Sequence, residues 1–113
     1  MLNQITLIGR LGAAPEIKQV GGNTVANFRL ATSEKWTDKN TGEKQERTEW
    51  HSIELWGRKA EVAGQYLDKG SLVYVQGKLH YKTRELEGGD SRTYTTVRGD
   101  NFQMLGGGSA TLP

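Results

Sequence analysis

The sequence predicts an all-β fold, a five-stranded Greek-key barrel with one short helix between the third and fourth strands. Three observations indicate this fold class. Fifteen glycines against two prolines are typical of many turns between uninterrupted strands. Five segments alternate apolar and polar residues, and one further segment has helical spacing. With 113 residues, the chain has room for a single domain.

Two predicted strands precede a long charged segment. Residues 2–11 form the first strand, which bends at its glycines, and residues 23–32 form the second, with apolar side chains on alternate positions. Residues 34–47 are mostly charged and contain Trp36. Because this segment offers no apolar face, we expect an exposed, mobile hairpin or loop that joins the second strand to the third.

The third predicted strand, residues 48–57, has two different faces. Ile53 and Leu55 form an apolar face. The opposite phase is polar and carries two indoles, Trp50 and Trp56. A strand rises about 3.3 Å per residue, so these two rings are roughly 20 Å apart. We expect two separate stacking platforms rather than one aromatic pair.

One short helix and two more strands complete the pattern. Apolar residues recur at helical spacing over residues 60–69, and Gly70 stands where a left-handed C-terminal cap belongs. Residues 71–84 form the fourth strand, whose outward phase is basic. The fifth strand begins near Arg92 and bends at Gly99.

This order of elements resembles the oligonucleotide/oligosaccharide-binding (OB) fold, a five-stranded Greek-key barrel that suits so short a chain. We expect the OB domain to cover residues 1–105. Residues 106–113 are expected to form a flexible, glycine-rich C-terminal end.

Composition excludes several functional classes. The chain has no cysteine, which removes disulfides, thiolate zinc sites and cysteine nucleophiles and favours a reducing compartment. No apolar run approaches the roughly 20 residues that span a bilayer, and no signal peptide is present, so we expect a cytoplasmic protein without a membrane partner. His51 and His80 have no complementary metal ligands, so we expect no metal, no cofactor and no enzymatic activity.

Tryptophans among basic residues favour binding of an extended nucleic-acid strand. Every base has a π-face, so stacking on Trp36, Trp50 and Trp56 would hold a single strand without reading its sequence. A net charge of +2 permits such a polyanionic partner. The candidate phosphate contacts are Lys18, Arg29, Arg58, Lys69, Lys78, Lys82 and Arg84.

Two other functions would use the same side chains. In a protein-interaction barrel, the tryptophans would form a dry partner surface, and oligonucleotides would not quench their fluorescence. An oligosaccharide-binding module would also expose tryptophans. It would leave the basic phase of the fourth strand without a purpose.

Several segments together form a specific set of motifs. The most informative are Thr48-Glu49-Trp50-His51 and residues 60–71, and further matches lie in residues 8–12, 25–34, 77–79, 94–96 and 103–106. With these motifs, the chain resembles the bacterial single-stranded DNA-binding proteins over about residues 2–106. The resemblance implies a non-enzymatic homotetramer that coats and protects single-stranded DNA in replication, recombination and repair, in the cytoplasm at the nucleoid.

The resemblance also assigns roles to individual residues. The three tryptophans fall on the family's stacking positions, whereas His51 falls where subunits meet, and Tyr74 serves packing or the same interface. A dimeric replication accessory protein of the primosome is the alternative within this class. The set of three tryptophans favours the tetrameric family.

Two features depart from the family pattern. Arg84 stands where a further stacking aromatic is expected, and either its guanidinium plane or Tyr81 takes that role. The family usually continues through a disordered linker to an acidic tip that recruits replication and repair proteins. Here no acidic residue follows Asp100 and the sequence ends at Pro113, so the chain is either a trimmed core or a variant without that docking function. Such partner proteins are expected only if an acidic tail exists outside this chain.

Overall fold

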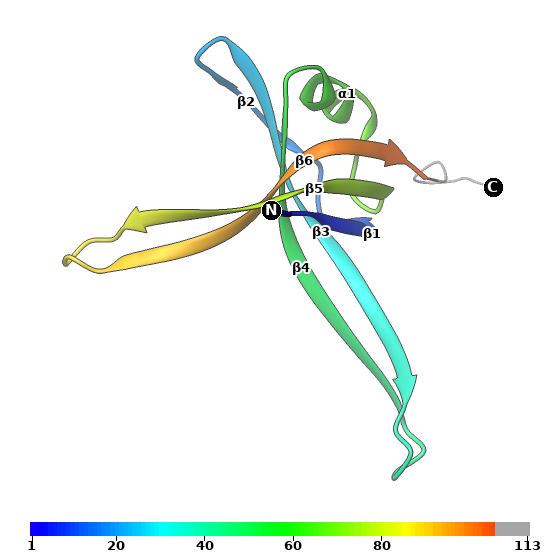
Figure 1. Ribbon diagram of the computed structural model, residues 1–113. Coiled ribbons are helices and arrows are strands. Elements are labelled where there is room, and N and C mark those ends of the chain that lie inside the picture. Colours follow the sequence, from blue (N-terminus) through cyan, green and yellow to red (C-terminus); the bar gives the residue numbers. More distant parts are fainter. Residues whose placement is uncertain (106–113) are drawn as a thin grey trace.

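Six strands and one helix make up the part of the chain that the computed structural model describes, residues 1–105 (Figure 1). In chain order they are β1 (Ile5–Leu11), β2 (Glu16–Val20), β3 (Asn23–Thr37), β4 (Lys44–Trp56), α1 (Arg58–Tyr66), β5 (Leu72–Glu85) and β6 (Ser91–Met104). The expectation for residues 106–113 lies outside the described residues.

Five of these strands close into a barrel. The strand order is β1-β5-β6-β4-β3, and β1 pairs again with β3, so the sheet returns to its own edge. Gly9 permits this closure, because a Cβ atom there would collide with the carbonyl oxygen of Ala31. The helix α1 follows β4 and precedes β5, which are the third and fourth barrel strands. The predicted fold is therefore confirmed.

Two of the pairings that close this single sheet are short, and we call them seams. Strands β2, β3 and β4 lie on one side of the seams, and β1, β5 and β6 lie on the other. At the first seam, β1 meets β3 at the pairs Arg10–Ala31 and Leu11–Leu30. At the second seam, β4 and β6 run parallel and pair only at Ile53–Val97 and Glu54–Arg98.

The core lies inside the barrel. Its largest fully buried side chains come from β3, β4 and β5 and are Leu30, Ile53, Leu55, Val73 and Val75. The helix covers the core with two alanines that have no exposed surface, Ala60 and Ala63. Leu30, Ile53 and Leu55 are buried, as the alternation in the second and third predicted strands indicates.

The strand β2 was not predicted. Its five residues are all exposed, and its two apolar residues, Ile17 and Val20, do not alternate with polar ones at a period of two. Its structure comes from backbone pairing with β3 across a two-residue turn, Gly21-Gly22, in which both glycines have positive φ. β1 and β2 pair with the same edge of β3: β1 pairs at Ala31 and Leu30, and β2 pairs from Asn27 to Asn23.

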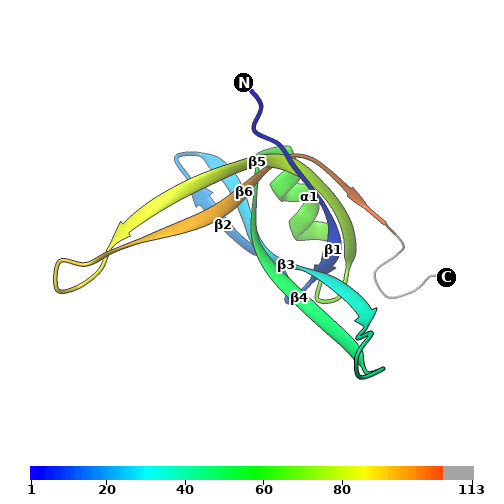
Figure 2. The same ribbon diagram turned by 60° about the horizontal axis from the view of Figure 1, so that its bottom comes forward.

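Two hairpin arms extend from the barrel in different directions (Figures 1 and 2). The β3–β4 arm comprises residues 33–48, and its strands stay paired to Thr37–Lys44. Thus the predicted segment 34–47 is a hairpin, and its strands are longer than expected. The β5–β6 arm comprises residues 80–95, all of them exposed. The predicted bend at Gly99 coincides with a shift of the β5–β6 register.

The helix ends earlier than the sequence pattern predicts. Its last residue is Tyr66, and Leu67 is extended so that its side chain reaches the core. Gly70 does have a positive φ of 88°, but it belongs to the turn after the helix. In that turn, the Ser71 amide donates to the Asp68 carbonyl, and the Gly70 amide donates to Leu11 of β1.

Candidate single-stranded nucleic-acid interface

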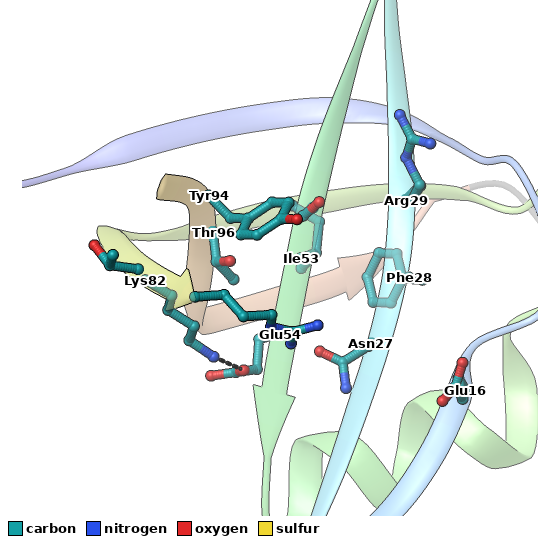
Figure 3. Close-up of a pocket in the computed structure, with 12 residues that line it drawn as sticks. Glu16, Asn27, Phe28, Arg29, Ile53, Glu54, Lys82, Tyr94 and Thr96 are labelled. Carbon is teal, nitrogen blue, oxygen red and sulfur yellow. Dashed lines mark hydrogen bonds and ion pairs between the residues drawn. The ribbon is translucent and has the colours of Figure 1, made fainter. Parts of the chain in front are cut away.

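An open groove of about 650 Å³ crosses the outside of the barrel between the β3–β4 sheet and the β5–β6 arm (Figure 3). We call this the main groove. Its floor includes Asn27, Arg29, Ser52 and Glu54, and its wall includes Lys82, Arg84, Tyr94 and Thr96. The strand register explains why these residues line one groove. Asn27 pairs with Glu54, and Lys82 pairs with Tyr94, so the side chains of each pair lie on the same outer face of the sheet.

Trp50 extends the main groove at one end. Its side chain is 51% exposed and lies over the backbone of Gly12, where a Cβ atom would come within 2.6 Å of the indole. A hollow of about 350 Å³ beside Trp50 shares lining residues with the main groove, namely Glu16, Asn27, Phe28 and Arg29. Trp50 and the main groove therefore form one continuous surface.

Cationic side chains cover aromatic rings along this surface. The guanidinium of Arg29 lies 5.4 Å from the centroid of the Trp50 ring. Arg84 lies 5.7 Å from the centroid of Tyr94, which is itself exposed in the wall of the main groove. Each pair places a stacking surface next to a charge that can bind phosphate.

The sequence did not single out Tyr94 as a site residue. Its role depends on the β5–β6 register, which places Tyr94 opposite Lys82 and in the phase of Arg84. Tyr81 is more exposed but pairs with Thr95 in the other phase. Of the two tyrosines, Tyr94 lines the main groove and Tyr81 does not.

Trp56 is half-buried and engaged on two sides. Its Nε1 atom donates a hydrogen bond of 2.7 Å to Oε1 of Glu54. The guanidinium of Arg98 lies over the ring, 4.9 Å from its centroid. Trp56 therefore offers less free stacking surface than Trp50.

Trp36 lies on the β3–β4 arm, away from the main groove. It is 47% exposed and pairs with Gln45, in the alternation phase opposite to that of Trp50. Its own hollow, of about 470 Å³, is lined by Lys35, Thr37, Lys44, Gln45 and Glu46. The three tryptophans therefore lie in three different environments.

Glu54 is an acidic residue in the floor of the main groove. Its side chain is only 9% exposed, and its Oε2 atom accepts a 2.6 Å charged hydrogen bond from Nζ of Lys82 (Figure 3). Burial raises the pKa of Glu54. Hydrogen bonds from Lys82 and Trp56, together with the charges of Lys82 and Arg98, lower this pKa by more than burial raises it. The net pKa lies below its ordinary value of 4.5. Glu54 is therefore ionised at neutral pH.

The other candidate phosphate contacts do not line the main groove. Lys18 is on β2 and forms an exposed ion pair of 3.0 Å with Glu16, which does line it. Arg58 begins α1 and lies 4.0 Å from Glu61. Lys69 is in the turn after α1, and Lys78 lies four residues before Lys82 on β5, in the same phase.

His51 and Tyr74 lie outside the lining of the main groove. His51 shares the phase of Ile53, as predicted, and its Nε2 atom is 2.8 Å from the hydroxyl of Thr32. Tyr74 is half-buried on β5 and pairs with Ile8 of β1, which is exposed.

Residues 1–105 contain no group of three His, Cys, Asp or Glu side chains placed to hold a metal ion. In the same range, no helix has the length and apolar character needed to cross a membrane.

The closed barrel and its continuous surface of aromatic and cationic side chains define an OB-fold protein with an open ligand-binding face. Residues 2–105 match the model of the single-strand binding protein family, and the chain belongs to this family. The predicted family is thereby confirmed.

Two solved structures show the same relationship. The Plasmodium falciparum SSB in complex with ssDNA has a TM-score of 0.84 and 38% identity, over 93% of this chain and 96% of that chain. A deletion mutant of the single-stranded DNA-binding protein from Thermus aquaticus has a TM-score of 0.78 and 34% identity, over 94% of this chain and 51% of that chain. This chain thus spans about half the length of the Thermus protein.

Proposed function

We propose that the protein binds single-stranded DNA without reading its base sequence, along the surface from Trp50 through the main groove to Tyr94. The observation that carries this proposal is the pairing of Arg29 with Trp50 and of Arg84 with Tyr94 on one continuous surface. Family membership supports the ligand class, as does the similar Plasmodium falciparum structure in complex with ssDNA.

Binding would exchange contacts that already exist in the free protein. A base that stacks on Trp50 occupies the ring face that Arg29 covers, and the guanidinium then turns to the adjacent phosphate. Stacking contributes roughly 1–3 kcal/mol per base and is tolerant of sequence. Phosphate contacts make the affinity salt-dependent. Trp36, on the β3–β4 arm, would supply a further platform outside the main groove.

The same reasoning extends to the assembly and its setting. We infer a homotetramer with His51 and Tyr74 at subunit interfaces, which acts in replication, recombination and repair in the cytoplasm at the nucleoid. Exposed Ile8 beside half-buried Tyr74 supports an interface on that face. The protein would act by binding alone, and replication proteins would join it only through an acidic tail outside this chain.

Tryptophan fluorescence tests the proposed function directly. The protein is titrated with a thymine homopolymer at low and high salt, with a duplex of equal length as the control. We expect deep quenching by the single strand alone, and weaker binding at high salt. Absence of quenching by either DNA would overturn the proposal and favour a barrel whose tryptophans bind another protein.

A further inference from the structure

The buried carboxylate of Glu54 conflicts with the charge that a DNA-binding groove requires. It lies in the floor of the main groove with its side chain 9% exposed. A negative charge in that position repels phosphates and engages a cation that would otherwise bind them. This side chain therefore needs a functional explanation beyond the stability of the fold.

The cation that Glu54 engages is Lys82, the one lysine among the residues that line the main groove. Its Nζ atom lies 2.6 Å from Oε2 of Glu54, and the other carboxylate oxygen accepts the Trp56 indole hydrogen. The pair spans the seam between β4 and the β5–β6 arm, where the backbone pairs only at Ile53–Val97 and Glu54–Arg98. Both carboxylate oxygens thus accept a hydrogen bond, one from Trp56 on β4 and one from Lys82 on β5.

Burial decides whether Lys82 can leave this pair. Lys82 is itself half exposed, but its departure would leave an ionised, buried carboxylate without its main countercharge. The exposed pair of Lys18 with Glu16 is different, because water can solvate both groups when they separate. Phosphate should therefore compete successfully for Lys18 and fail for Lys82.

We propose that Glu54 withholds Lys82 from the phosphates of bound DNA and so lowers the number of phosphates that the main groove neutralises. Phosphate contacts in the groove then fall to Arg29 and Arg84, for which residues 1–105 show no ion pair. Glu54 thereby limits both the affinity for DNA and its salt dependence. This inference rests on the proposed function.

The salt dependence of binding counts phosphate contacts. For single strands, the logarithm of the binding constant falls with the logarithm of salt concentration with a slope of about −0.7 per phosphate neutralised. The experiment measures this slope with a thymine oligonucleotide for the wild-type protein and for Glu54→Gln, Lys82→Met and the double variant. Glu16→Gln is the matched control, because it removes one groove charge from an exposed ion pair.

We expect Glu54→Gln to steepen the slope by about 0.7 and to tighten binding at low salt, because Lys82 becomes available to phosphate. Lys82→Met alone should leave the slope unchanged, and the double variant should return to the wild-type slope. The Glu16→Gln slope should equal that of the wild type. A shallower slope for Lys82→Met, or an unchanged slope for Glu54→Gln, overturns the inference.

A measurement on the wild-type protein does not depend on whether the variants fold. NMR of the Lys82 ammonium group detects its hydrogen bond to Glu54, through the coupling between the ammonium nitrogen and the carboxyl carbon, in the free protein and in the thymine complex. If Lys82 stays with Glu54, this coupling persists in the complex; its loss on binding shows that Lys82 has moved and overturns the inference. Failure of the wild-type protein to bind thymine oligonucleotides overturns the proposed function itself, so the two failures are distinguishable.

Discussion

The guanidinium of Arg29 lies over the ring of Trp50, 5.4 Å from its centroid. The two residues come from adjacent strands, because Trp50 pairs with Ala31 and Arg29 pairs with Ser52. Under the proposed function, a base that stacks on Trp50 would displace Arg29, which would then contact the adjacent phosphate.

Removal of the Arg29 charge should change the salt dependence of DNA binding and leave the stacking of bases on Trp50 largely intact. For Arg29→Gln, we expect the salt slope to become shallower by about 0.7, because one phosphate contact is lost. Trp50 should still be quenched by a thymine oligonucleotide. Salt titrations followed by fluorescence measure both quantities. An unchanged slope would exclude Arg29 from the phosphate contacts.

Loss of the Trp50 ring should weaken binding without unfolding the protein. Trp50 is half exposed, so Trp50→Ala should cost roughly 1–3 kcal/mol of binding free energy while the free energy of unfolding changes little. For Trp56→Ala, we expect a loss of stability as well, because Glu54 loses a hydrogen bond in a buried position. Oligonucleotide affinity and urea denaturation, measured on both variants, separate the two effects. Equal affinity of Trp50→Ala and wild type would remove Trp50 from the site.

The two tyrosines of the β5–β6 arm provide a matched pair of substitutions. Tyr94 lines the main groove, whereas Tyr81 lies in the opposite phase. We expect Tyr94→Ala to weaken binding by roughly 1–3 kcal/mol and Tyr81→Ala to leave it nearly unchanged. Isothermal titration with thymine oligonucleotides measures the difference. The reverse order would show that Tyr81 supplies the missing aromatic.

Acid should destabilise the fold in part through Glu54. Its pKa in the folded state lies below the ordinary value, because Lys82, Trp56 and Arg98 favour the carboxylate. The stabilisation is therefore present above the ordinary pKa and is lost as the pH falls through the lowered one. Urea denaturation between pH 7 and 3 should show this loss in the wild type and a smaller loss in Glu54→Gln. Parallel curves would mean that the ion pair makes no net contribution.

A bulkier residue at His51 should disturb the proposed assembly. His51 is half-buried in a single chain and bonded to Thr32, so a larger side chain there must project outward. For His51→Trp, we expect smaller species in sedimentation velocity at equal protein concentration. A matched substitution on the β5–β6 arm, Tyr81→Trp, should leave the assembly unchanged. An unaltered sedimentation coefficient for His51→Trp would refute the interface assignment.

Most of the barrel could be predicted because its strands bury every second side chain, which gives an alternation of apolar and polar residues. Ile53 and Leu55 alternate with polar neighbours, and this pattern is visible in the sequence itself. β2 and the distal ends of β3 and β4 could not be predicted in the same way, since their residues are exposed and held by backbone pairing with a partner strand. Local patterns do not carry that information.

The site could be predicted only where it depends on one strand. The outward phase of Trp50 follows from β4 alone. The pairing of Glu54 with Lys82 joins residues 28 positions apart and depends on how β4, β5 and β6 come together. The same register selects Tyr94 over Tyr81. The ligand class can therefore be predicted from single strands, whereas the contacts across the groove depend on how the strands come together.

The two short seams of the barrel have a consequence for its motions. Few residues pair across the seams, so partial opening there should cost less than opening along the long β3–β4 or β5–β6 pairings. The main groove lies across the β4–β6 seam, and a strand bound in it would hold the two sides of the seam together. A ligand that binds only the closed barrel would then reduce the population of the opened state by mass action. Occupancy of the groove would thus be coupled to the rigidity of the barrel.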